Sequence, residues 1–105
     1  MELKTIKKVV IVTESSIKDE VIKLITDLGA KGYTIDNVCG RGERGIWDDD
    51  SLLGEYLRNI KIEALTTEDV AEKIIASVVE SFFKNYAGIA YMHDVQVVRA
   101  EKFRI

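Results

Sequence analysis

The stretch NIKIEALTTEDVAEKIIASVVESFF, Asn59 to Phe83, changes its hydrophobic period part-way along. Apolar and polar residues alternate from Ile60 to Ala64, which predicts a strand with one buried face. Apolar residues then recur every three or four positions, which predicts a helix. The capping-box pair Thr66 and Asp69 marks the start of that helix. The stripe that we expect to be buried consists of Ala71, Ile74, Ile75, Val78 and Phe82.

The first part of the chain has the same order of strand and helix. KKVVIVTE (Lys7–Glu14) is a β-branched run too short for a helix and is typical of a buried strand. The following SSIKDEVIKLITDLGAKG predicts a helix with a capping box at Ser16 and Asp19 and a C-cap at Gly29. Its expected buried stripe consists of Ile17, Val21, Leu24, Ile25 and Leu28.

Two further strands complete the pattern. GYTIDNVCG (Gly32–Gly40) is one, with Tyr33 and Ile35 expected on the same face, and AGIAYMHDVQVVRAEKF (Ala87–Phe103) contains the other, followed by a tail. The predicted order is βαββαβ. This order is typical of the ferredoxin-like α+β fold, an antiparallel sheet with two helices on one face.

The first and last strands carry apolar residues on both faces, although the helices would cover only one. In the first strand, Val9 and Ile11 alternate with Val10 and Val12. Strands that are covered on both sides have this composition, and an exposed apolar sheet is a liability in a monomer. We therefore expect another copy of the chain to cover the open face in an oligomer.

Composition limits the classes of function. The 105 residues suit a single domain, 1–105. The 15 Lys and Arg against 18 Asp and Glu give a net charge of −3, which argues against general nucleic-acid binding. The single Cys39 cannot form an internal disulfide and is expected to be buried. With no apolar run of the about 18 residues that a membrane span needs, and no signal-peptide pattern, we expect a cytoplasmic protein.

A long loop, CGRGERGIWDDDSLLGEY (Cys39–Tyr56), separates two strands that a short turn could join. Loops of this length are usually functional or disordered. Its start, Gly40 to Gly45, predicts either a phosphate cradle of backbone N–H groups and a guanidinium, or a turn with two solvated arginines. We expect the outer segment, Ile46 to Tyr56, to be partly or wholly disordered without a partner, because burial of a few side chains rarely outweighs its backbone entropy.

Five segments of the chain, in their order along the predicted fold, resemble the PII signalling family. They are VVIVTE (9–14), GAKGYT (29–34), GRGER (40–44), NIKIEALT (59–66) and NYAGIAY (85–91). Within the family, the chain is most similar to the PII-like subfamily. That subfamily includes the SbtB-type regulators of bicarbonate transporters and the carboxysome-associated PII proteins.

The resemblance implies a homotrimer that holds an adenine nucleotide (AMP, ADP, ATP or cyclic AMP) in each cleft between subunits, with bicarbonate as a further candidate ligand. It also implies a flexible T-loop, about 41–56, that binds or releases a partner according to the nucleotide. The implied partner is an inorganic-carbon (bicarbonate) transporter or another regulatory target, so the protein would reach a membrane only through it. The implied function is regulatory, without catalysis and without a metal.

The resemblance also implies which residues form the sites. Those implied to bind nucleotide are Thr34, Gly42, Arg44, Glu63, Leu65, Gly88, Ile89, Arg99 and Lys102. The residues expected to bind the partner are Ile46, Trp47, Leu52 and Leu53, because apolar side chains in a polar loop are common interface anchors; they could equally pack back on the domain. The chain departs from the family in its B-loop, here a short segment at about 84–88 with one glycine, and at Arg44, where the family has a metal-linked glutamine. Binding of Mg-ATP with 2-oxoglutarate is therefore not expected.

Other interpretations of these residues stay open at this point. Thr34, Glu63 and Leu65 also suit ordinary sheet positions, and Lys102 suits a charged tail. The rival functions are a CutA-like trimeric metal-tolerance protein and a weak nucleotide hydrolase acting through Arg44. One Cys and one His make the first of these a poor match, because a metal site needs clustered Cys, His or Met.

Overall fold

The computed structural model describes residues 1–42, 45–47 and 59–103. The main sheet contains β1 (Lys4–Glu14), β2 (Thr34–Val38), β5 (Asn59–Thr66) and β6 (Gly88–Val97). The helices are α1 (Lys18–Asp27) and α3 (Glu68–Ser81), with 3-10 turns at Ser15–Ile17 and Ala100–Lys102. No helix in this part of the chain is long and apolar enough to cross a membrane.

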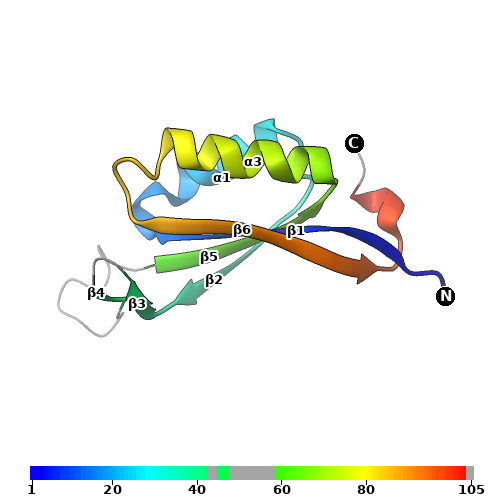
Figure 1. Ribbon diagram of the computed structural model, residues 1–105, viewed down its shortest axis with the longest axis horizontal. Helices are drawn as coiled ribbons and strands as arrows, with labels where there is room; N and C mark the ends of the chain where they lie inside the picture. The colour runs from blue at the N-terminus through cyan, green and yellow to red at the C-terminus, as the bar shows by residue number, and fades with distance from the viewer. Residues whose placement is uncertain (43–44, 48–58, 104–105) are drawn as a thin grey trace.

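The four strands are antiparallel and run in the order β2-β5-β1-β6 across the sheet. Both α1 and α3 lie on the same side of this sheet, and no helix of the described residues lies on the opposite side (Figure 1). This is the α+β, ferredoxin-like arrangement that the sequence predicts.

The core lies between the sheet and the two helices. β1 is one of the two inner strands, so that Ile11 lies opposite Ile62 of β5 on one side and Ala90 of β6 on the other. The predicted helical stripes face this core, with Val21 and Ile25 of α1 and Ile74 and Val78 of α3 fully buried. The periodicity of both helices is therefore confirmed.

The open face of the sheet is apolar. Val10 and Val12 of β1 are already buried there by their neighbours in the single chain. On β6, Ile89 and Tyr91 remain 53% and 45% exposed, and Tyr33 beside β2 is 45% exposed. Nothing in the described part of this chain covers these large side chains.

The predicted capping boxes are wrong at both helices. A 3-10 turn, Ser15–Ile17, precedes α1, so Ser16 lies inside the turn and the helix has no side-chain cap. At α3 the N-cap is Thr67, whose hydroxyl accepts a hydrogen bond from the Val70 N–H at 3.4 Å. Thr66 still belongs to β5 and is fully buried in the ladder opposite Lys7. The strand therefore continues to the position where the sequence predicts the cap.

The loop after β2 contains a second, small sheet. β3 (Gly40–Gly42) pairs with β4 (Gly45–Trp47), and Arg41 lies opposite Ile46. β4 thus includes Ile46 and Trp47 of the segment that we expect to be partly or wholly disordered, and 48–56 lie outside the described residues. Cys39, between β2 and β3, is exposed rather than buried.

Ala87 lies in the connection from α3 to β6. Its backbone N–H and carbonyl are both hydrogen-bonded to side chains at the end of β1. The Thr13 hydroxyl donates to the Ala87 carbonyl at 2.8 Å, and the Ala87 N–H donates to the Glu14 carboxylate at 2.7 Å. The next residue, Gly88, has no room for a side chain. A Cβ there would lie 2.4 Å from Cε1 of Phe83 and 2.9 Å from the Val12 carbonyl oxygen.

Gly88→Ala should therefore destabilise the protein by about 1–3 kcal/mol, because either the Phe83 ring or the β1 backbone must move. Gly32→Ala is the matched control, since a Cβ at Gly32 meets nothing within 4 Å; it should change stability by less than about 0.5 kcal/mol. Urea unfolding of both variants measures the difference. Equal midpoints for the two variants would contradict the tight packing at Gly88.

Candidate functional site

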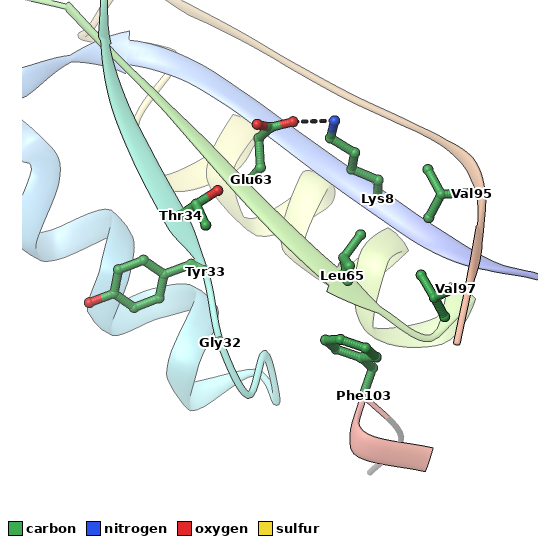
Figure 2. Close-up of a pocket in the computed structure, with 9 residues that line it drawn as sticks. All are labelled: Lys8, Gly32, Tyr33, Thr34, Glu63, Leu65, Val95, Val97 and Phe103. Carbon is green, nitrogen blue, oxygen red and sulfur yellow. Dashed lines mark ion pairs between the residues drawn. The ribbon is translucent and has the colours of Figure 1, made fainter. Parts of the chain in front are cut away.

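A cavity of about 470 Å³ opens on the uncovered face of the sheet, at the end where β5 meets its helix (Figure 2). Its apolar wall consists of Leu65 of β5, Val95 and Val97 of β6, and Phe103 after the last 3-10 turn. Its polar lining consists of Lys8, Gly32, Tyr33, Thr34 and Glu63. Cavities of this size that combine apolar walls with a few fixed polar groups are typical small-ligand sites.

An ion pair between Lys8 and Glu63 occupies one end of the cavity, opposite Phe103 (Figure 2). Strand register produces this pair. Lys8 lies opposite Leu65, and Glu63 is two residues away on the same face of β5, also opposite Thr34 of β2. The hydrogen bond from Lys8 lowers the pKa of the Glu63 carboxyl from its ordinary value, against the opposing effect of burial. Glu63 is therefore an ionised acceptor within the cavity at neutral pH.

The chemistry of this cavity suits a flat ligand with a polar edge. Leu65, Val97 and Phe103 offer apolar contact, while the Glu63 carboxylate and the Thr34 hydroxyl offer polar partners at one rim. An exocyclic amino group or a sugar hydroxyl could donate to Glu63, and Lys8 could donate to a ring nitrogen.

Three of the residues implied to bind nucleotide, Thr34, Glu63 and Leu65, line this one cavity. Gly88 and Ile89 lie at the other end of the sheet, where Gly88 is paired with Thr13. From Gly88 to Val95 the strand runs for about 23 Å at about 3.3 Å per residue. The two groups of residues therefore do not meet within one chain.

The basic residues near the C-terminus lie at the same end as the cavity. Arg99 follows β6 and precedes the 3-10 turn that contains Lys102, and both side chains are exposed. The backbone of Arg99 is left-handed, with φ of 60°, the only non-glycine residue with positive φ among those described. A conformation that disfavours a side chain usually persists where the side chain has a function.

The remaining predicted residues have no described side chains. Gly42, Ile46 and Trp47 are placed by backbone alone, in β3 and β4. Arg44, Leu52 and Leu53 lie outside the described residues. No group of three His, Cys, Asp or Glu side chains that could hold a metal is found in the described part of the chain.

Sequence reasoning missed most of the cavity lining. Lys8 resembles any polar residue near the start of a strand, and only the ladder register places it next to Glu63. Tyr33, predicted on the face of Ile35, directly precedes β2 and borders the cavity, with its ring pointing away from the other lining side chains (Figure 2). Val95 and Val97 were recognised as apolar without a role. Phe103 comes from the tail, for which the sequence offers no signal.

The model of the family described as nitrogen regulatory protein P-II matches residues 6–102. The chain belongs to this family. The match covers both helices, β2, β5 and β6, β1 from Ile6 onward, and every cavity residue except Phe103. The P-II resemblance of the separate motifs is therefore confirmed at the level of the family.

Several solved structures are similar to this P-II protein over nearly its full length. A protein of Thermus thermophilus, described as PII-like and signalling, is 41% identical, with a TM-score of 0.84, covering 98% of this chain and 99% of its own. CPII, a nitrogen regulatory PII-like protein from Thiomonas intermedia K12, is 30% identical, with a TM-score of 0.89 and coverage of 99% and 98%. That structure of CPII is bound to ADP, AMP and bicarbonate. Another, bound to ADP and bicarbonate, is 31% identical, with a TM-score of 0.84 and 98% of both chains covered.

The Lys8–Glu63 pair should make stability depend on acid. The Glu63 pKa is lower in the folded than in the unfolded chain, so the pair stabilises the fold above the ordinary carboxyl value of 4.5. That contribution is lost as the pH falls through the lowered folded-state pKa. Because the pair is partly exposed, we expect about 1 kcal/mol or less.

Glu63→Gln should remove this part of the acid dependence, so its melting temperature should fall less between pH 6 and pH 3 than that of the wild type. Glu80→Gln is the matched control, because Glu80 pairs with Lys84 on the exposed surface of α3. It should retain the acid dependence of the wild type. Parallel curves for the wild type and Glu63→Gln would show that the pair does not contribute.

Proposed function

We propose that this P-II protein is a nucleotide-sensing regulator whose ligand sites lie between the subunits of a homotrimer. The observation that carries the proposal is the separation of the implied site into two parts. Thr34, Glu63 and Leu65 line the cavity at one end of the sheet, while Gly88 and Ile89 lie at the other. A single ligand can contact both parts only if they come from neighbouring copies.

The open face of the sheet supports the homotrimer. Ile89 and Tyr91 leave an apolar surface exposed on the side of the sheet that α1 and α3 do not cover. Burying such a surface against another copy removes it from water, which is the main favourable term in association. The same contact would bring the cavity of one subunit towards the 84–88 connection of the next.

The proposed ligand is an adenine nucleotide: AMP, ADP, ATP or cyclic AMP. In this proposal the base occupies the cavity, with Thr34, Glu63 and Leu65 around it, and Arg99, Lys102, Arg44 and the backbone at Gly42 reach the phosphates. Gly88 and Ile89 of the neighbouring subunit complete the phosphate side. The ADP and AMP bound to CPII support this ligand class, and the bicarbonate bound there supports bicarbonate as a second ligand.

The proposed output is the loop at about 41–56, with Ile46, Trp47, Leu52 and Leu53 as partner contacts. The loop leaves the sheet at Val38 and returns at Asn59, which lie opposite each other. A nucleotide would change partner affinity as far as it binds one loop state better than another. We place the protein in the PII-like subfamily of SbtB-type and carboxysome-associated regulators, as a cytoplasmic, non-catalytic protein whose partner is a bicarbonate transporter or another regulatory target.

Static light scattering at micromolar concentration should give three times the mass of the chain. Replacing the exposed apolar residue Tyr91 by Lys should shift the protein towards monomer, because association would have to bury an unpaired charge. Val79→Lys is the control, since Val79 is 48% exposed but lies on α3, away from the open face. A monomeric wild type would contradict the proposal.

Calorimetry should detect AMP and ADP binding to the wild type. Arg99→Gly should weaken both about ten- to a hundredfold, since hydrogen bonds to charged groups contribute about 1.5–3 kcal/mol. It should leave adenosine binding unchanged and should not lower stability, because glycine adopts positive φ at no steric cost. Lys23→Gln, on the exposed surface of α1, is the control. If adenosine and AMP weaken equally in Arg99→Gly, Arg99 does not contact phosphate.

A further inference from the structure

The lining of the cavity carries one positive and one negative charge, and these cancel. Among the described residues that line it, Lys8 and Glu63 are the only charged ones, and they form an ion pair with each other (Figure 2). Both are partly buried, since 30% of the Lys8 side chain and 22% of the Glu63 side chain are exposed. Charges that are partly removed from water act more strongly on a nearby ligand than fully solvated charges do. The net charge of the lining therefore affects which ligands the cavity accepts.

Strand register places the Lys8 ammonium against the Glu63 carboxylate. Lys8 lies on β1 between β5 and β6, directly opposite His93 of β6. The hydrogen bond from Lys8 is the largest cause of the lowered pKa of Glu63, and the charges of Lys61 and His93 lower this pKa less. Lys61 in turn lies opposite Asp36 of β2 on the same face of the sheet. Within the described part of the chain, Lys8 is therefore the main group that compensates the charge of Glu63.

We propose that Lys8 is a positioning residue of the nucleotide site, whose ammonium orients the Glu63 carboxylate and cancels its charge so that the cavity accepts an anionic nucleotide. This inference rests on the proposed function, in which the base lies beside Thr34, Glu63 and Leu65. A phosphate monoester carries about −1.5 to −2 charges at neutral pH. If Glu63 were unpaired, this phosphate would approach a like charge in a partly buried site, and its affinity would fall. A nucleoside without phosphate would not meet this repulsion.

Variants on both sides of the ion pair separate this role from a purely structural one. Lys8→Met keeps an unbranched apolar stem and removes the ammonium, which leaves Glu63 unpaired. Glu63→Gln keeps the shape and one acceptor oxygen, and it leaves Lys8 unpaired. Each variant breaks the same ion pair, so a loss of stability is common to both, while the net charge of the cavity changes in opposite directions. The double variant makes the cavity neutral again.

The experiment measures the affinities of AMP and adenosine by calorimetry, at pH 8 and low, constant ionic strength, without divalent metal. In Lys8→Met the ratio of AMP to adenosine affinity should fall about five- to thirtyfold, the scale of one unit charge acting on another across a partly buried site. In Glu63→Gln the ratio should rise. In the double variant it should return to within about twofold of the wild type, and Lys8→Arg should keep the wild-type ratio because it keeps the charge.

Lys7→Met is the matched control, because it removes the same charge from the adjacent residue of β1. Successive side chains of a strand point to opposite faces, and Lys7 pairs with Asp94 of β6 rather than with a cavity residue. Its ratio of AMP to adenosine affinity should therefore stay within about twofold of the wild type.

Three results would overturn the inference. The first is an unchanged ratio in Lys8→Met, and the second is an equal fall in Lys7→Met, which would show an effect of overall charge alone. The third is a ratio that stays low in the double variant, which would show that Lys8 acts on the phosphate itself rather than through Glu63. If the wild type binds AMP, each of these results leaves the proposed function standing. If it binds no adenine nucleotide, the proposed function fails and this inference fails with it.

Discussion

The pairing of β1 along both of its edges fixes the geometry on which the rest of the molecule depends. β5 and β6 are bonded to the same inner strand, so a residue of β1 has a defined neighbour on each side. Lys8 thereby reaches Glu63 at one end of the sheet, and Thr13 and Glu14 reach Ala87 at the other. From Lys8 to Glu14 this strand spans about 20 Å. One rigid element therefore sets the distance between the cavity and the α3–β6 connection.

The placement of both helices on one face has a direct consequence for the site. Both α1 and α3 cover the same side of the sheet. No element of the described residues covers the other side (Figure 1). Val10 and Val12 are shielded by their neighbours, but Ile89 and Tyr91 are not. An apolar face with a cavity at one end can be both an interface and a binding surface. In such an arrangement, ligand binding and subunit association are thermodynamically linked.

The helices and their buried faces were predicted well, because both follow from the spacing of apolar residues in the local sequence. The stripes of Val21 and Ile25 and of Ile74 and Val78 face the core as expected, and Gly29 ends α1 with φ of 118°. The exact ends were less predictable. Thr66 and Thr67 are chemically equivalent as caps, and the extra ladder pair of Thr66 with Lys7 decides between them. Such a choice depends on the partner strand, which the local sequence does not contain.

The candidate site was predicted only in part, because some of its residues are brought together by strand pairing that the local sequence does not contain. Thr34, Glu63 and Leu65 could be assigned through their motifs, and the structure brings them into one cavity. Lys8 and Phe103 could not, because their place in the cavity follows from strand register and from the path of the tail. The Glu14–Ala87 contact joins residues 73 positions apart, and no spacing rule predicts it. Long-range contacts that depend on register are therefore the limit of reasoning from one sequence.

Glu14 lies between the α3–β6 connection and the loop that joins β2 to β5. Glu14 lies opposite Asn59, the first residue of β5, and Asn59 lies opposite Val38, the last residue of β2. The loop between β2 and β5 therefore ends one strand away from Glu14 and begins two strands away. By linkage, a ligand at the α3–β6 connection and a partner at the loop could alter each other's affinity only through a shared element, and by the same factor in both directions. The end of β1 is the shared element that the described residues provide.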